Sequence, residues 1–453
     1  MPSFDEFSIR APRSTGDIIL ISSSKIFNLV YTISKSLNEP EGARRREKVL
    51  RNGNNPTVID QRNATRLRVL EQIRTSGQIS RIDIAASLQT SPATVTSATA
   101  DLMAAGLIHE TAGEASPDAA KRGRPRVLLE LNANSNIIAG VKVARDVIMV
   151  MLVDFQGNEL AQTQFRLTEP RMSAETLVVT IGRAVNEACE TLGKNIADVS
   201  GIAIGLAGQV VAEQNFIYWS SSITENNVDL DPILSQQLPC PAFVENDANL
   251  VAKGEQLFGL GQGLQNFLVI TIEHGVGLGI VLGGALYRGE RGCGAEFGHT
   301  KVQLDGALCQ CGQRGCLEAY VSDYALMREA VIAMQDDKPS SVADIRKSAE
   351  DGNPSAIAVL ERASRMFGMG VSNLVNLFDP ERIILSGRTS SIEHLCSEQV
   401  KEHIRNNVVQ VDAPTPEILA HDWGGLMWAK GAAAYGIEQV SVLQVLEMNA
   451  HGA

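Results

Sequence analysis

The chain contains the stretch Gly294-Ala295-Glu296-Phe297-Gly298-His299, followed ten residues later by Cys309-Gln310-Cys311-Gly312-Gln313-Arg314-Gly315-Cys316-Leu317-Glu318. Within eighteen residues it supplies one imidazole and three thiols, those of His299, Cys309, Cys311 and Cys316. Cys and His are the preferred ligands of tetrahedral Zn²⁺, and four protein ligands leave no open position for a catalytic water. The pattern predicts a structural zinc site. The alternative is a set of buried core cysteines, which behave as small hydrophobic groups.

The same stretch resembles the signature of the ROK family, named for its repressors, open reading frames and sugar kinases. The resemblance runs from about Gln61 to about Gly436. It implies zinc bound by His299 and the three cysteines, and a sugar hydrogen-bonded by Glu296, His299 and Glu318. It also implies the two-lobed, actin-like ATPase fold of sugar kinases, with the sugar in the cleft between the lobes.

Length and composition indicate how many domains the chain has and which class of protein it belongs to. At roughly 150 residues per domain, 453 residues predict about three domains. An apolar content of 44% is ordinary for a globular chain with a sizeable core. Seven cysteines, an odd number with three of them clustered, argue against a disulfide framework and favour a reducing cytoplasm.

Charge is distributed unevenly along the chain. Residues 1–130 carry 18 Lys and Arg against 14 Asp and Glu, a net of +4, whereas the whole chain carries −12, which leaves −16 for residues 131–453. A basic front on an acidic body predicts that only the front meets nucleic acid.

The first 57 residues are interpreted as a poorly ordered leader. The apolar run at 18–33 is too short to span a membrane, and it lacks the basic start and the cleavage site of a signal peptide. The charged run at 38–55 is interpreted as a solvated linker, with a nucleic-acid-contacting arm as the alternative. We expect a winged helix-turn-helix domain at 58–131, a kinase-like body at 132–440 and a C-terminal tail at 441–453.

Three short helices are predicted in the front domain. The first begins near Asn63 and ends at Gly77, and the second opens with the capping hydroxyl of Ser80. The third begins where Ser91 caps and Pro92 takes the first helical position, and it runs to about Ala105. The short connection between the second and third helices is typical of a helix-turn-helix.

The third helix is the predicted recognition helix. Its core-facing residues leave three hydroxyl-bearing side chains for DNA, those of Thr94, Thr96 and Ser97. None of them is Arg or Lys, so base readout would depend on hydroxyl and methyl contacts. We expect phosphate affinity to come from a basic wing formed by Lys121, Arg122, Arg124 and Arg126. The alternative is a solvated hairpin tip. The segment from Ser80 to Arg126 also resembles the DNA-binding segment of ROK repressors.

The sequence pattern of the body predicts an α/β fold, because strand-like apolar runs alternate with helical stretches. The strand-like runs lie at 137–141, 147–153, 201–206, 267–272 and 383–385.

The resemblance to ROK kinases fails at the loops that hold ATP phosphates. In those kinases the first loop carries an Asp, two Gly and a Thr, whereas here Lys142, Ala144, Arg145 and Asp146 occupy the matching positions. In the second loop Glu273 and His274 stand where the kinases have Gly and Thr. Near the end, Gly387-Arg388 keeps one of a pair of glycines. Bare backbone amides are needed for close approach to phosphates, so the comparison predicts a protein without kinase activity.

The sugar-binding side of the resemblance is better preserved. Asn246 and Asp247 match the family's Asn-Asp pair, in which the Asp is the general base of the kinases and both residues bind sugar hydroxyls. Asp247 is therefore interpreted as a vestigial base. The alternative role of Asp247 is that of a helix N-cap.

These observations together predict a sugar-responsive, DNA-binding transcriptional regulator, a repressor of carbohydrate transport or catabolic genes. Its expected partners are an operator in double-stranded DNA, a sugar or sugar derivative, and a second copy of itself in a homodimer or homotetramer, with no membrane. An active ATP-dependent sugar kinase and a zinc-stabilised protein-docking scaffold without a sugar ligand are the alternatives.

Overall fold

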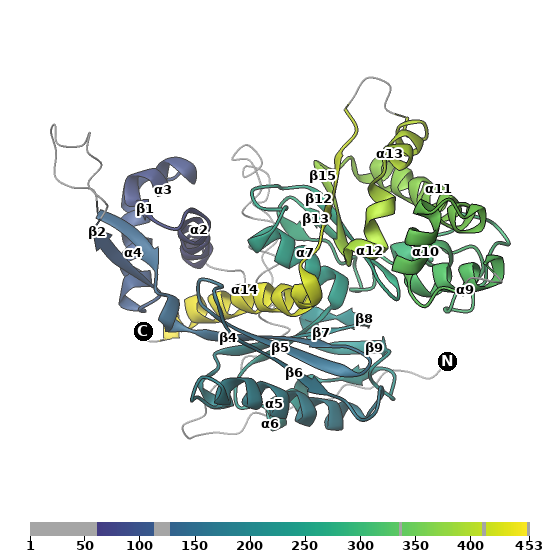
Figure 1. Cartoon of the computed structure of the whole chain (residues 1–453). Coiled ribbons are helices and arrows are strands. Elements are labelled where there is room, and N and C mark those ends of the chain that lie inside the picture. Colours follow the sequence, from purple (N-terminus) through teal and green to yellow (C-terminus); the bar gives the residue numbers. More distant parts are fainter. Residues whose placement is uncertain (1–60, 113–126, 335–337, 410–413, 451–453) are drawn as a thin grey trace, which may run out of the picture.

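The computed structural model describes residues 61–112, 127–334, 338–409 and 414–450 (Figure 1). The predicted leader at 1–57 and the four wing cations Lys121, Arg122, Arg124 and Arg126 lie outside these ranges.

The front domain is a winged helix. Its helices are α2 (Gln61–Ser76), α3 (Arg81–Ser87) and α4 (Pro92–Ala104), and its sheet has the order β1 (Ile79–Ser80), β3 (Val127–Leu131), β2 (Ile108–Ala112). The predicted caps are present, since the hydroxyl of Ser80 accepts from the amide of Asp83 and that of Ser91 from the amide of Thr94. Gly77 and Gly106 adopt positive φ where the first and third helices end. The predicted three-helix pattern is confirmed.

The body contains two five-stranded sheets with the same topology. In chain order the first sheet is built from β4 (Ile137–Val143), β5 (Val147–Asp154), β6 (Glu159–Arg166), β7 (Gly201–Leu206) and β11 (Ala242–Asn246). The second is built from β12 (Phe267–Ile272), β13 (Val276–Leu282), β14 (Ala285–Leu286), β15 (Arg382–Gly387) and β16 (Glu417–His421). Each has the spatial order third, second, first, fourth, fifth, with the first three strands antiparallel and the last two parallel to the first. The body is therefore a duplicated α/β fold of two lobes, as predicted.

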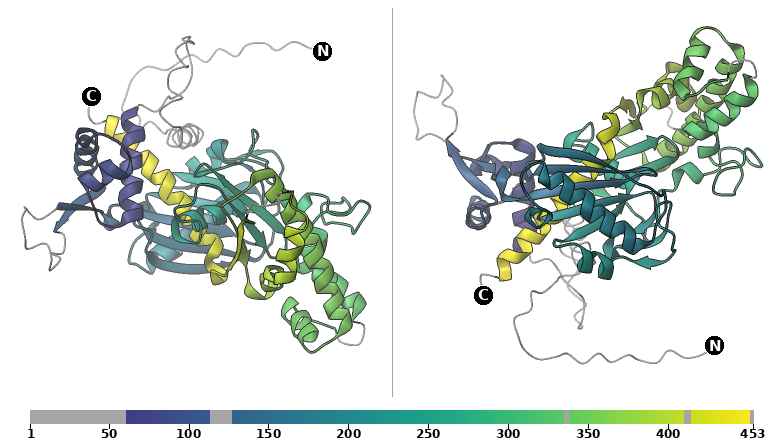
Figure 2. Two further views of the ribbon diagram at one scale, coloured as in Figure 1. Left: turned by 90° about the horizontal axis from the view of Figure 1, so that it is seen from above. Right: turned by 60° about the horizontal axis from the view of Figure 1, so that its bottom comes forward.

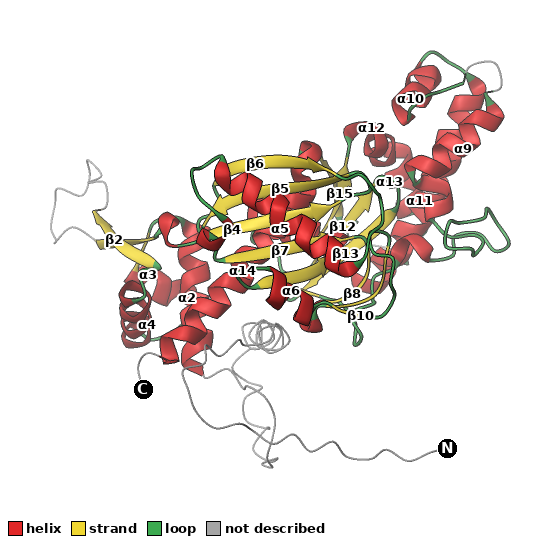
Figure 3. Cartoon of the chain, turned by 90° about the horizontal axis from the view of Figure 1, so that it is seen from below, coloured by secondary structure: helices red, strands yellow, loops and turns green. Residues whose placement is uncertain are grey.

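Two long helices hold the lobes together. α7 (Asp247–Phe258) follows the last strand of the first sheet and α14 (Met427–Ala450) follows the last strand of the second. α14 lies on one face of the first sheet and packs against α7, while α5 (Ala174–Glu190) and α6 (Asp231–Gln237) cover the opposite face (Figures 1 and 3). Glycines allow this close packing. A Cβ on Gly140 of β4 would lie 2.2 Å from the carbonyl oxygen of Ala429 in α14.

The remaining elements complete the two lobes. A small sheet beside the first lobe consists of β8 (Gly208–Val211), β9 (Phe216–Ser220) and β10 (Val228–Asp229). The second lobe carries a helical extension at the end of the molecule opposite the winged helix (Figure 2). Its helices are α8 (Glu318–Val321), α9 (Asp323–Ala333), α10 (Val342–Glu350), α11 (Pro354–Phe378), α12 (Thr389–Ile392) and α13 (Glu398–Arg405).

The winged helix shares a hydrophobic core with the body. One cluster joins Val69 and Ile73 of α2 to Phe155 after β5 and to Ile437 and Val445 of α14. The predicted tail at 441–453 is wrong as a separate segment, because α14 continues through residue 440 to Ala450 and buries Val442 and Val445. These positions are apolar because the winged helix covers them, which a local pattern does not reveal.

No helix among the described residues is long and apolar enough to cross a membrane.

Candidate functional site

The imidazole and three thiols singled out by the sequence form one cluster. The ligand atoms of His299, Cys309, Cys311 and Cys316 all lie within 4.8 Å of one another. The Nδ1 atom of His299 lies 3.7 Å from the Sγ atom of Cys309, and the Sγ atoms of Cys311 and Cys316 are 3.8 Å apart. Zn–S bonds of about 2.3 Å at tetrahedral angles require sulfur atoms about 3.8 Å apart. The cluster therefore fits a tetrahedral metal ion.

The local backbone explains how these four side chains meet. Gly312 and Gly315 both have positive φ, and a Cβ on Gly315 would lie 1.7 Å from the carbonyl oxygen of Gln303. A side chain at 315 is excluded, so the loop can fold back on itself only with glycine there. Cys311 is exposed, which argues against the alternative of three core cysteines.

Charged and polar side chains surround the cluster. The ammonium of Lys301 lies 2.9 Å from the Sγ atom of Cys316, and the Oε1 atom of Glu318 lies 3.4 Å from the Sγ atom of Cys309. The hydroxyl of Tyr324 lies 3.4 Å from the Oε1 atom of Glu318 and 3.7 Å from the Sγ atom of Cys309, either of which can accept its proton. Glu318, a predicted sugar ligand, thus adjoins the predicted metal site.

The predicted sugar ligands from both lobes approach one another. Burial raises the pKa of the Glu296 carboxyl; nearby His299 opposes this effect, and the negative charges of Glu318 and Asp247 add to it. The four side chains therefore share one electrostatic environment, and we call this group, Asp247, Glu296, His299 and Glu318, the interlobe site. Because the Nδ1 atom of His299 faces the thiols, its Nε2 atom is left for another partner.

Asn246 has a structural role at the start of α7. It is the N-cap of α7, accepting hydrogen bonds from the amides of Ala248 and Asn249, and its own amide group donates to the carbonyl oxygen of Gly208. The cap role considered for Asp247 therefore belongs to Asn246, and Asp247 is the first residue of the helix.

Asp247 is paired with a buried lysine. The Nζ atom of Lys142 in β4 lies 2.5 Å from the Oδ2 atom of Asp247, and the two side chains are only 8% and 18% exposed. The same ammonium lies 4.7 Å from the ring centroid of Trp428, a cation–π distance. The predicted base position, Asp247, therefore has the side chain of Lys142 as its ion-pair partner.

Glu273, in the turn between β12 and β13, also lies near this pair. Burial raises the pKa of the Glu273 carboxyl, opposed by the positive charges of Arg388 and Lys142. The imidazole of His274 packs against the ring of Tyr324, with centroids 5.6 Å apart. Sequence reasoning missed Trp428 and Tyr324, because neither belongs to a motif and both reach the site only through the fold.

The recognition helix presents its predicted face. Thr94, Thr96 and Ser97 are exposed, while Val95 and Ala98 are buried on the opposite side of α4. Asp101, near the end of the same helix, pairs with Arg62 and Arg66 of α2. These two arginines therefore brace α2 against α4.

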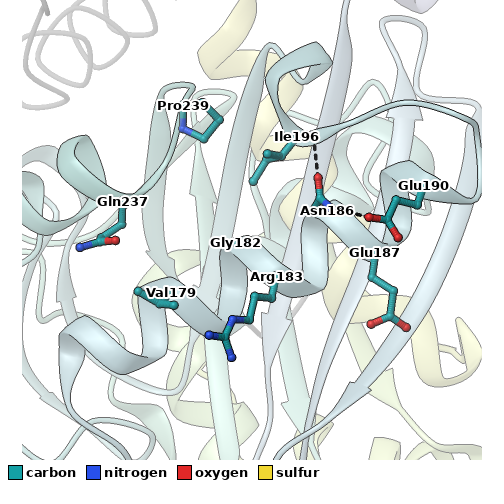
Figure 4. A pocket seen from close by; sticks show the side chains of 9 residues that line it. All are labelled: Val179, Gly182, Arg183, Asn186, Glu187, Glu190, Ile196, Gln237 and Pro239. Carbon is teal, nitrogen blue, oxygen red and sulfur yellow. Dashed lines mark hydrogen bonds between the residues drawn. The ribbon is translucent and has the colours of Figure 1, made fainter.

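A cavity of about 640 Å³ lies elsewhere, on the outer face of the first lobe. Figure 4 shows its lining from α5, with Arg183, Asn186 and Glu187, and from the segment near Pro239. None of the predicted site residues lines it.

Comparison with known proteins agrees with this architecture. The profile of the ROK family matches residues 138–437, and that of the MarR family matches residues 63–115. The first match covers most of the body and well over half of the chain. The chain belongs to the ROK family.

Similar members include regulators and kinases. The xylose repressor of Caldicellulosiruptor bescii is 29% identical over 362 residues, 77% of this chain and 89% of that protein. The glucokinase of Streptomyces coelicolor is 32% identical over 312 residues, 65% of this chain and 94% of that protein. The crystal structure of a ROK family transcriptional regulator, a homolog of the Escherichia coli MLC protein, aligns with a TM-score of 0.73 and 28% identity, covering 85% of this chain and 98% of that one. The regulators resemble this ROK protein in both of its domains, whereas the glucokinase matches a shorter part of it.

Proposed function

We propose that this ROK protein is a sugar-responsive transcriptional repressor of carbohydrate transport or catabolic genes, acting in the cytoplasm where its operator lies. The observation that carries the proposal is the fusion of a winged helix to a kinase-like body whose base position is paired with Lys142. The xylose repressor and the MLC homolog, which are similar across both domains, support it.

Loss of catalysis follows from the same ion pair. A general base must accept a proton from the sugar hydroxyl, and the Oδ2 atom of Asp247 already accepts a hydrogen bond from the ammonium of Lys142. Lys142 also contacts Trp428, so it cannot leave Asp247 without losing a second contact.

An active kinase is the second candidate, favoured by the presence of Asp247 and by the glucokinase relative. A coupled assay for ADP formation with ATP and glucose, xylose or N-acetylglucosamine separates the two. We expect no sugar-dependent ADP; turnover with any of these sugars would favour the kinase.

We propose that the interlobe site binds the effector sugar. Carboxylates accept hydrogen bonds from sugar hydroxyls, and an imidazole can donate one. Glu296→Gln removes a charged acceptor and should weaken sugar binding about tenfold or more in calorimetry. Glu290→Gln, an exposed acid six residues earlier, is the matched control. Equal affinity in both variants would remove Glu296 from the site, and no heat with any sugar would favour the docking scaffold.

We propose that zinc is bound by His299, Cys309, Cys311 and Cys316. A metal there would supply structural cross-linking between two loops and would fix the imidazole of His299 toward the sugar. Cys311→Ser should lower the zinc content and the thermal stability, whereas Cys293→Ser, a nearby cysteine outside the cluster, should change neither. Unchanged zinc in the Cys311 variant would overturn the ligand assignment.

We propose that Thr94, Thr96 and Ser97 contact operator bases and that the wing cations contact phosphates. Binding two half-sites requires two recognition helices, which favours a homodimer or homotetramer. Light scattering that finds a monomer both free and on DNA would contradict this assembly.

A further inference from the structure

α14 touches the interlobe site at one end and the winged helix at the other. Near its start, the ring of Trp428 contacts Lys142, the partner of Asp247. Thirteen residues later, about 20 Å along a helix, Ser441 faces α2. One continuous helix therefore spans the distance between the two functional regions (Figure 1).

The contact at the far end is made by Arg74 of α2. Its side chain is only 4% exposed. One guanidinium nitrogen donates to the hydroxyl of Ser441 at 3.2 Å, and another donates to the carbonyl oxygen of Phe155, at the turn after β5. The guanidinium also lies 4.7 Å from the centroid of the Phe155 ring. Arg74 thus belongs to the DNA-binding domain but makes these contacts with the body.

Apolar packing surrounds these contacts of Arg74 and holds α2 against α14. We call the contacts of Arg74 with Ser441 and Phe155 the Arg74 joint. Apolar residues of α2 belong to two clusters that include residues of α14: Val69 and Ile73 are members of the first, and Leu67 packs against both. Close-packed interiors transmit displacement because they have few voids to absorb it. The buried guanidinium also fixes the orientation of α2, because its hydrogen bonds form only in one relative placement of α2, α14 and Phe155.

We propose that Arg74 is the positioning residue through which a change at the interlobe site reaches the recognition helices. A ligand that contacts Asp247 changes the environment of Lys142 and Trp428, the first lobe and α14 move together relative to the second lobe, and the Arg74 joint carries the winged helix with them. Coupling of this kind requires only that the ligand favour one placement of the joint over the other. The inference depends on the proposed function for its sugar step, but not for the joint itself.

The test uses the full-length protein and two arginine variants of α2. Arg74→Met keeps the aliphatic stem and removes the charge and the hydrogen bonds. Arg68→Met is the control, since the described contact of Arg68 is with the carbonyl oxygen of Leu88 inside the winged helix. Ser441→Ala is a milder variant that removes one acceptor.

The joint is tested without any sugar. Calorimetric unfolding of the wild type and of Arg68→Met should show the winged helix and the first lobe melting together. In Arg74→Met the winged helix should melt separately, and the α2 amides should exchange hydrogen faster. The proposal would be overturned if the winged helix and the first lobe of Arg74→Met still melted together and the α2 amides exchanged hydrogen at the wild-type rate.

The coupling is tested with glucose, xylose and N-acetylglucosamine as probes, on duplex DNA from upstream of the protein's own gene. Arg74→Met should bind the active sugar about as well as wild type, while the sugar's effect on DNA affinity, typically about 5- to 150-fold in coupled proteins, should fall to near unity. A full sugar response in Arg74→Met would overturn the role of Arg74. Failure of every sugar to act on the wild type would instead count against the proposed function, and the unfolding experiment would still decide the joint.

Discussion

At the scale of single residues, the ion pair between Lys142 and Asp247 dominates the interlobe site. Removing one member leaves the other charge buried without its partner, which in proteins costs about 3 kcal/mol or more. Because the Asp247 side chain is 18% exposed, the expected loss is smaller: Lys142→Met should lower the free energy of unfolding by about 2–3 kcal/mol, and Lys142→Met with Asp247→Asn should lose less than the two single variants added together. Urea unfolding measures all three; additive losses would show that the two side chains do not interact.

His394 provides a pH-dependent prediction in the second lobe. Burial lowers the pKa of its imidazole to about 4, helped by the positive charge of nearby Arg346, and neither ring nitrogen has a hydrogen-bond partner among the described residues. Because the folded state disfavours protonation, the stabilisation is complete above the unfolded pKa of about 6.5 and is lost as the pH falls toward 4.

Protonation of His394 should lower the free energy of unfolding by as much as about 3 kcal/mol as the pH falls from about 6.5 to about 4. His394→Leu should flatten the decline of stability between pH 7 and pH 4 in urea unfolding. His109→Leu, at an exposed position of β2, is the control. An equally steep decline in the His394 variant would exclude this imidazole as the cause.

At the scale of elements, the close packing of α14 on the first sheet depends on Gly140 of β4. A Cβ on Gly140 would meet backbone atoms of α14, 2.2 Å from the oxygen of Ala429 and 2.4 Å from the nitrogen of Ala433. Gly140→Ala should cost about 3 kcal/mol, since neither atom can rotate away. Gly425→Ala is the matched control because its Cβ would meet nothing within 4 Å. Equal stability of the two variants in urea would mean that α14 has room to shift.

Elements with local signals could be predicted from the sequence. The starts of α3 and α4 are predictable because capping by Ser80 and Ser91 is decided within a few residues. The cluster of His299 and three cysteines could be predicted because its members are close in sequence. The end of α14 was missed because the burial of Val445 depends on a domain almost 400 residues earlier. Likewise, nothing local links Lys142 to Asp247, which lie 105 residues apart.

At the scale of the whole molecule, the winged helix and the body form one continuous structure. A shared core, a buried arginine and a single helix join the winged helix to the region of the interlobe site. Such an arrangement suits a protein in which occupancy of one region changes the placement of the other. In the proposed function, the interlobe site binds the ligand and the winged helix provides the response.

The most direct test of this account is the affinity of the purified protein for DNA from upstream of its own gene, measured by fluorescence anisotropy at fixed salt with and without glucose, xylose and N-acetylglucosamine. Fixed salt is essential because phosphate contacts make DNA affinity strongly salt-dependent. The account predicts tight binding that one sugar changes by about tenfold or more. Tight DNA binding that stays unchanged by a sugar shown calorimetrically to bind the same protein would contradict it.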